Sequence, residues 1–172
     1  MRPEFVFALI YVLVWRVFEL LLSKRNERKA LALGARVVEN DGMGSIIVVH
    51  TLWIVGLIVE ELFGNGPYFS SEIQGVALGV YVLSELLRVA CIWNLGPRWN
   101  VRVIVLDAVA PVTRGPYSWL KHPNYVAVVI GLAALPVALG LPWIAVLIVP
   151  LKLLALRKRL RVENEALYGV QT

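Results

Sequence analysis

The stretch GPYSWLKHPNY, residues 115–125, lies between hydrophobic segments and ends by opening a new apolar run. Proline is favoured at the first position of a helix, because its missing N–H would have no intrahelical partner there. We therefore expect a membrane helix to begin at Pro123. Its first free N–H groups, those of Asn124, Tyr125 and Val126, should face the aqueous side. A helix start of this kind favours an anion.

The composition excludes an ordinary soluble domain. The chain has 172 residues, of which 59% are hydrophobic, and its apolar runs are long enough to cross a bilayer. We predict an all-α integral membrane protein that forms one domain over residues 1–172, since no linker, repeat or low-complexity tract divides it. About five transmembrane helices are expected, at residues 4–22, 45–63, 73–95, 123–139 and 142–156. Only Gly140 and Leu141 separate the last two, which predicts a short helical hairpin.

The basic residues indicate an orientation. Thirteen of the seventeen Lys and Arg residues lie in residues 23–44, in residues 96–122 or after residue 156, whereas residues 64–72 and 140–141 contain none. The positive-inside rule then places the N-terminus outside and the C-terminus in the cytoplasm. The net charge of +5 could suggest nucleic acid, but no nucleic-acid-binding motif accompanies it. We expect contacts with membrane lipid headgroups instead, and no nucleic-acid partner.

Charged residues lie inside the predicted spans, where an unpaired charge is costly, and four of them form two closely spaced pairs. Arg16 and Glu19 are three residues apart, as are Glu85 and Arg88. Each pair can therefore neutralise itself on one helix face. The second pair could also line one wall of a site whose other wall is the stretch 115–125.

Small residues four positions apart occur twice, as Gly75 with Gly79 and as Ala127 with Gly131. Such spacing allows close helix approach. We favour packing within the chain over a dimer seam, and the sequence specifies no oligomeric state. The lone cysteine lies in a predicted span and the two histidines are far apart, so we expect no metal site.

Three separated pieces can converge on the cytoplasmic face. The segment WNVRVIVL, residues 99–106, is too short to span a membrane and should lie at the interface or re-enter between helices, with Asn100 and Arg102 exposed to a cavity. The other two pieces are the stretch 115–125 and the charged tail after the last span. This mixture of cations, carboxylates, imidazole and aromatic rings suits a zwitterionic, adenine-bearing cofactor that meets a lipophilic acceptor.

Several stretches of the sequence resemble a known family. GPYSWLKHPNY, the hairpin and then RVENEAL (residues 161–167) look like the isoprenylcysteine carboxyl methyltransferase superfamily, whose members carry Gly-Pro-Tyr, Arg-His-Pro-x-Tyr and a late Arg…Glu-Glu. RWNVRVIVL (98–106) and RVFELLLSKRNE (16–27) look more like the compact bacterial branch found alongside type III polyketide synthases. The resemblance implies a bacterial plasma-membrane protein with a cytoplasmic site for S-adenosylmethionine, bound without a Rossmann domain.

The resemblance also implies site residues. Residues 122–125 match His-Pro-x-Tyr, and Arg161 and Glu163 match the late Arg and first Glu. The expected cofactor-binding residues are Tyr117, Lys121, His122, Pro123, Asn124, Tyr125, Arg161, Glu163 and Glu165. The expected catalytic residues are Asn100, Arg102 and Glu163.

Two positions depart from the family pattern. Lys121 replaces the usual Arg, which keeps the charge but loses the bidentate fork. Asn164 stands where many members have a second Glu, and Glu165 follows it. Either Glu163 or Glu165 could therefore be the carboxylate that contacts the cofactor.

The implied reaction is methyl transfer to an oxygen, a carboxylate or an enol or phenol, of a lipophilic membrane-embedded acceptor such as an alkylpyrone, an alkylresorcinol or a prenylcysteine-like compound. The alternative enzyme is an NADPH-dependent sterol-type double-bond reductase of the same superfamily. A non-catalytic membrane scaffold or small channel is the alternative from another class.

Overall fold

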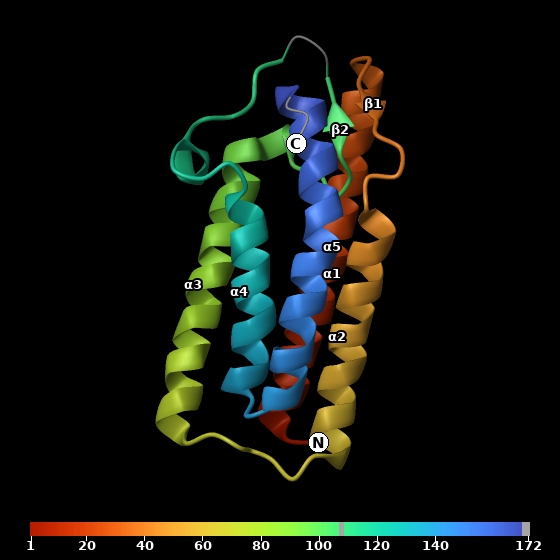
Figure 1. Ribbon diagram of the computed structural model, residues 1–172. Helices are drawn as coiled ribbons and strands as arrows, with labels where there is room; N and C mark the ends of the chain where they lie inside the picture. Colours follow the sequence, from red (N-terminus) through yellow and green to blue (C-terminus); the bar gives the residue numbers. More distant parts are fainter. Residues whose placement is uncertain (107–108, 170–172) are drawn as a thin grey trace.

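A computed structural model describes residues 1–106 and 109–169 of the protein. The five helices are α1 (Pro3–Ala32), α2 (Met43–Phe63), α3 (Ser71–Leu95), α4 (Pro123–Ala138) and α5 (Pro142–Tyr168). They run alternately up and down, so that the start of α1 and the end of α5 lie at opposite ends of the bundle (Figure 1). Each predicted span lies within one of these helices apart from the last residue of the fourth, so the predicted helical architecture is confirmed.

The helices differ in how well they suit a membrane. α1, α2 and the segment Ser71–Arg98 are long and apolar enough to cross one, and their outer faces expose large apolar side chains. α4 is apolar but has only 16 residues, about 24 Å of helix against a hydrocarbon core of about 30 Å. α5 is apolar only in its first half.

The predicted short hairpin is correct at its turn and wrong in the length of its second helix. Gly140 has a φ of +72°, which favours glycine, and its carbonyl accepts the N–H of Tyr68 at 3.1 Å. Glu60 accepts the N–H groups of Trp143 and Ile144, which fixes the start of α5. α5 then continues past residue 156 to Tyr168, because the Lys, Arg and Glu residues that follow are good helix formers.

α4 and the first half of α5 form the centre of the bundle. Their buried side chains, among them Leu132 and Ile148, pack with apolar residues of α1, α2 and α3 in one core. A Cβ at Gly131 would lie 3.1 Å from Ser84 Oγ, so α4 and α3 approach closely there. Nothing described lies within 4 Å of a Cβ at Gly75 or at Gly79. Packing within the chain is thus confirmed for Gly131 and wrong for the other two glycines.

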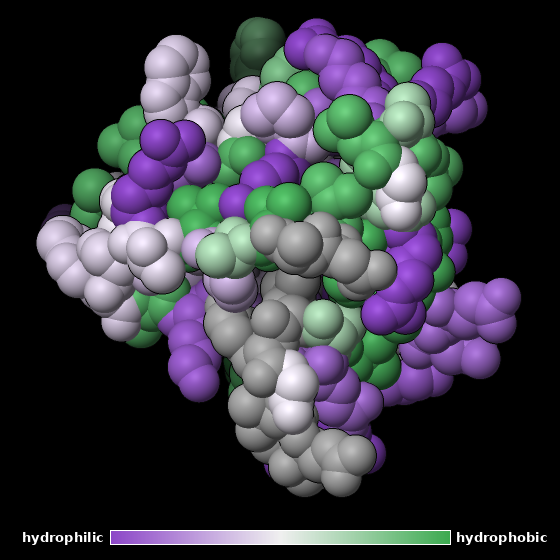
Figure 2. Space-filling view, turned by 90° about the horizontal axis from the view of Figure 1, so that it is seen from above, coloured by the Kyte–Doolittle hydropathy of each residue, from purple (hydrophilic) through white to green (hydrophobic). Residues whose placement is uncertain are grey.

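The basic connections gather at one end of the bundle, which we call the basic end. It carries the strands β1 (Arg36–Val37) and β2 (Ile104–Val105), which pair antiparallel, and the short helices η1 (Gly96–Arg98) and η2 (Gly115–Ser118). The strand pair was not predicted, because two residues are too few to show a period. Hydrophilic side chains gather at several places on this end (Figure 2). The N-terminus and the connections that contain no basic residue lie at the opposite end (Figure 1).

Candidate functional site

A cavity of about 470 Å³ lies at the basic end and extends inward between the helices, with lining residues from all five of them. Its volume is within the range of about 300–1,000 Å³ that is typical of small-molecule sites. Among the residues predicted from the sequence, those that line it are Asn100, Arg102, Tyr117, Lys121, His122, Asn124, Tyr125 and Glu163. Three separate pieces of the chain therefore converge, as expected.

Three of the predicted residues lie elsewhere. Pro123 is buried at the first position of α4, where it starts the helix. Arg161 and Glu165 are exposed on α5 and are not among the residues that line the cavity. Of the two candidate carboxylates, the structure brings only Glu163 to the cavity.

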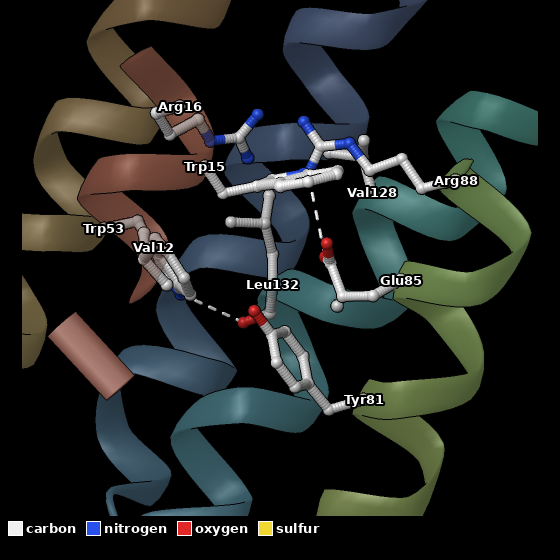
Figure 3. A pocket seen from close by; sticks show the side chains of 10 residues that line it. Val12, Trp15, Arg16, Trp53, Tyr81, Glu85, Arg88, Val128 and Leu132 are labelled. Carbon is white, nitrogen blue, oxygen red and sulfur yellow. Dashed lines mark hydrogen bonds and ion pairs between the residues drawn. The ribbon is translucent and has the colours of Figure 1, made fainter. Parts of the chain in front are cut away.

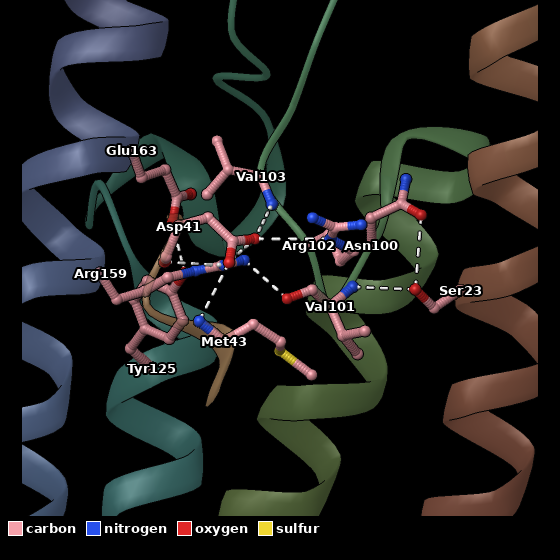
Figure 4. A network of polar contacts seen from close by, with 10 residues as sticks. All are labelled: Ser23, Asp41, Met43, Asn100, Val101, Arg102, Val103, Tyr125, Arg159 and Glu163. Atoms are coloured by element: carbon pink, nitrogen blue, oxygen red, sulfur yellow. Dashed lines mark hydrogen bonds and ion pairs between the residues drawn. The ribbon is translucent and has the colours of Figure 1, made fainter. Parts of the chain in front are cut away.

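The arginine of α5 that lines the cavity is Arg159 and not the predicted Arg161. Its side chain is buried and makes four hydrogen bonds, to Tyr125 Oη at 3.0 Å, to the Asp41 carboxylate at 2.7 Å and carbonyl at 3.2 Å, and to the Val101 carbonyl at 2.7 Å. These bonds tie α5 to α4 and to two loops (Figure 4). Because few of its N–H groups stay free, Arg159 mainly holds the site together.

Asp41 is the second residue that sequence reasoning missed. It precedes α2, and its carboxylate accepts the N–H of Met43 at 3.0 Å and of Val103 at 3.1 Å in addition to Arg159. Burial disfavours the charged carboxylate, but these backbone N–H groups and Arg159 outweigh it and lower the pKa of Asp41. One carboxylate thus joins the start of α2, the segment at Val103 and α5.

His122 and Tyr125 of the His-Pro-x-Tyr match both contact the last turns of α5. His122 Nδ1 lies 3.6 Å from Glu163 Oε1, and Nε2 lies 2.8 Å from Asn164 Oδ1. Tyr125 donates its hydroxyl hydrogen to the other oxygen of Glu163. The His122 and Tyr125 rings stack, with centroids 5.6 Å apart. Asn164, at the departure from the family pattern, therefore orients the imidazole.

The contact between His122 and Glu163 favours the charged form of each side chain. Burial disfavours the imidazolium, but Glu163 and Asn164 outweigh it and raise the pKa of His122. Burial likewise disfavours the carboxylate, but His122 and Tyr125 outweigh it and lower the pKa of Glu163. An imidazolium donates from both ring nitrogens, which suits the two oxygen atoms that face it.

The backbone N–H groups at the start of α4 are less free than the sequence predicts. The His122 carbonyl accepts the N–H of Tyr125 at 3.2 Å and, more weakly, that of Val126 at 3.4 Å. Two of the three N–H groups expected to face water are therefore used within the chain. The prediction of an anion-binding helix start is weakened, because His122 itself closes the first turn.

Asn100 and Arg102 line the cavity from the segment between η1 and β2. Asn100 accepts a weak hydrogen bond from Ser23 Oγ at 3.4 Å, and the same hydroxyl accepts the N–H of Val101 at 3.0 Å. Arg102 is exposed and lies 3.9 Å from Asp41. Both residues are within reach of a ligand in the cavity, and their catalytic role stays a prediction.

The two predicted ion pairs inside the spans form one cluster. Glu19 of α1 accepts hydrogen bonds from Arg16 at 3.1 Å and from Arg88 of α3, and Glu85 lies 3.7 Å from Arg88. Each pair was expected to neutralise itself locally, whereas the structure joins them across two helices. Arg88 lines the cavity, as anticipated, and Glu85 faces a smaller adjoining pocket (Figure 3).

Periodicity could have identified Arg159. It lies four residues before Glu163 and seven after Lys152, so the three share one helix face, whereas Arg161 lies on another. A helix-start signal at Asn40-Asp41-Gly42 could have marked Asp41. Nothing in the sequence indicates that these two residues meet. In the part of the chain that is described, no group of three or more His, Cys, Asp or Glu side chains could hold a metal ion.

Several known proteins are similar to this chain. The isoprenylcysteine carboxyl methyltransferase (ICMT) family matches residues 77–169. An uncharacterized protein of Bacillus subtilis (strain 168), YpbQ, is 31% identical over 156 residues, which are 91% of this chain and 92% of that protein. An uncharacterized protein of Haemophilus influenzae is 24% identical over 157 residues, 91% of this chain and 90% of that protein. Mouse protein-S-isoprenylcysteine O-methyltransferase is 27% identical over 110 residues, 63% of this chain and 38% of that enzyme. No solved structure matches the chain.

Proposed function

Because the chain belongs to the isoprenylcysteine carboxyl methyltransferase family, we propose that it is a membrane methyltransferase that uses S-adenosylmethionine to methylate an oxygen of a lipophilic acceptor. The observation that carries the proposal is the convergence of three sequence pieces on one cavity at the basic end. At the centre of that convergence, Glu163 of α5 contacts His122 and Tyr125 of the His-Pro-x-Tyr match.

The cavity offers the groups that a zwitterionic nucleoside needs. The Glu163 carboxylate would hold the ammonium or a ribose hydroxyl. The positive charge of protonated His122, whose ring nitrogens face Glu163 and Asn164, would attract the cofactor carboxylate without a direct hydrogen bond. Buried polar atoms without a partner among the described residues, Asn124 Oδ1 and Trp99 Nε1, add an acceptor and a donor at the same cavity. Unsatisfied buried polar atoms are costly and are typical of ligand sites. Arg161 and Glu165 have no place in this arrangement.

S-adenosylmethionine would supply a methyl group on a sulfonium: its C–S bond breaks, the sulfur keeps the electron pair, and a C–O bond forms to the acceptor oxygen. The chain's own contribution is to align the two partners, which can account for much of the rate. A carboxylate or an acidic enol is already ionised at neutral pH, so these acceptors need no dedicated base, whereas a phenolic acceptor would have to give its proton to water or to a basic side chain of the cavity. Apolar residues such as Ile46 and Val128 line the inner cavity and would exclude water around the acceptor chain.

The two bacterial relatives match this chain over nine-tenths of their own length, whereas the mouse enzyme matches over 38%. This supports a compact protein of bacterial type, for which we propose an alkylpyrone or alkylresorcinol acceptor rather than prenylcysteine. We place the protein in a bacterial plasma membrane with the basic end, and hence the cofactor site, in the cytoplasm.

Calorimetry with S-adenosylhomocysteine and with NADPH tests the proposal on the purified protein in detergent. We expect binding of the first and none of the second. Glu163→Gln removes the charge that faces the cavity and should weaken S-adenosylhomocysteine binding by roughly ten- to a hundredfold. Glu165→Gln, an equal change on the exposed face of the same helix, should alter it less than twofold. NADPH binding alone would refute the function, and an unchanged affinity in Glu163→Gln would refute only the site.

A further inference from the structure

Three basic residues lie within the apolar helices instead of at their ends. They are Arg16 of α1, Arg88 of α3 and Lys152 of α5, and all three line the inner part of the same cavity. Lys152 is 2% exposed and Arg88 is 5% exposed. Each such charge costs free energy in a membrane unless it is paired or hydrated. Their convergence from three helices on one cavity therefore requires an explanation.

The two arginines have counter-ions and the lysine has none. Glu19 accepts hydrogen bonds from both arginines, and Glu85 lies 3.7 Å from Arg88. Lys152 makes no hydrogen bond or ion pair within residues 1–106 and 109–169. With all five side chains ionised, the inner cluster, which we define as these five residues, carries one positive charge in excess. A ligand with one negative charge would neutralise it.

The position of Lys152 indicates what kind of anion could reach it. It precedes Arg159 by seven residues on the same face of α5, which places it about 10 Å deeper into the bundle. Apolar residues of α2, including Ile46, Ile47 and Ile54, line the same cavity, together with His50. A phospholipid keeps its phosphodiester at the membrane surface, whereas an amphiphile with a carboxylate or enolate head can place that head inside the cavity.

We propose that the inner cluster binds the anionic oxygen, carboxylate or enolate, of the acceptor, and that Lys152 supplies its counter-charge. The inference rests on the proposed function and assigns the acceptor's class to named residues. A neutral lipid would leave Lys152 unpaired in an apolar environment. An anionic head neutralises it, and the apolar chain of the same molecule follows the apolar wall.

Lys152→Met separates this role from a structural one. Methionine fills similar space without the charge, so the ligand-free variant should melt at a higher temperature than the parent protein. The same change should weaken the binding of an anionic amphiphile. A lysine that merely supports the fold would give the opposite change in melting temperature.

The binding test uses the full chain in nanodiscs of phosphatidylcholine, with radiolabelled palmitate as the carboxylate probe and hexadecanol as its neutral match. We expect the parent protein to bind palmitate at least tenfold more tightly than hexadecanol. Lys152→Met should abolish this preference, Lys152→Arg should keep part of it, and Lys158→Met, at an exposed position of α5, should leave it intact.

Three results would overturn the inference. The parent protein could bind palmitate and hexadecanol equally, or Lys152→Met could keep the preference for palmitate. In the third, phosphatidylglycerol would displace labelled palmitate as effectively as unlabelled palmitate does. S-adenosylhomocysteine affinity, measured in parallel, should change less than twofold in Lys152→Met. If the parent protein fails to bind S-adenosylhomocysteine, the proposed function fails, whereas the palmitate result reports on Lys152 alone.

Discussion

The polar groups at the two depths of the cavity differ in how completely they are paired. At the basic end, His122, Tyr125, Glu163, Asp41 and Arg159 form what we call the outer network, and none of its buried side-chain atoms lacks a partner in the described part of the chain. In the inner cluster, Glu19 Oε1, Glu85 Oε2 and Arg88 Nε have no hydrogen-bond partner there.

This difference indicates different tasks. A fully bonded buried network stabilises one arrangement of the chain, because losing any member leaves another group unpaired. A partly bonded one costs stability until a ligand completes it. The outer network therefore positions the helices around the proposed cofactor site, and the inner cluster is ready for a ligand.

The largest effect is expected from Asp41→Ala. The substitution leaves the Arg159 guanidinium buried without its counter-ion, which typically costs about 3–5 kcal/mol. Unfolding in mixed detergent micelles measures the loss. Glu39→Ala removes an exposed carboxylate two residues away and should cost less than about 0.5 kcal/mol. Equal effects of the two substitutions would show that the outer network does not hold the helices together.

A smaller effect should appear as pH dependence. His122 has a raised pKa, so its contribution to stability is complete below pH 6.5 and is lost as pH rises through the raised value. Glu163 has a lowered pKa, so its contribution is complete above pH 4.5 and is lost as pH falls through the lowered value. The pair should stabilise the protein most between these limits, by roughly 1 kcal/mol.

Thermal unfolding as a function of pH measures this contribution. His122→Gln should flatten the alkaline limb of the curve relative to the parent protein, by about 2–4 °C in melting temperature. The substitution keeps a polar side chain beside Glu163 and Asn164 but cannot carry a charge. An alkaline limb that is as steep in the variant as in the parent would mean that His122 contributes no charge to the outer network.

The smallest effect is expected from Arg161→Gln. This side chain is exposed and does not line the cavity, so stability should change by less than about 0.5 kcal/mol and S-adenosylhomocysteine affinity by less than about twofold. Calorimetry and thermal unfolding of this variant test whether helix face, rather than basic charge alone, decides a residue's role. A tenfold loss of affinity would restore Arg161 to the site.

Much of the fold could be predicted because membrane helices depend on local features. The apolar runs, the proline at position 123 and the glycine at position 140 each act within a few residues, and all three predictions match the structure. The length of α5 could not be predicted from hydropathy, since the helix continues after its side chains become polar. The site pieces could be named from the family pattern, but which arginine faces the cavity depends on helix face.

The sequence by itself determined a helical membrane protein with basic connections at one end and the motif of a methyltransferase family. Only the tertiary structure decided that Arg159 rather than Arg161 meets Asp41 and Tyr125, and that Glu19 of α1 pairs with Arg88 of α3. Contacts between residues far apart in the chain depend on how helices rotate and pack against one another. A local sequence pattern cannot predict how a helix is rotated about its axis, because the side chains that determine the rotation come from several helices.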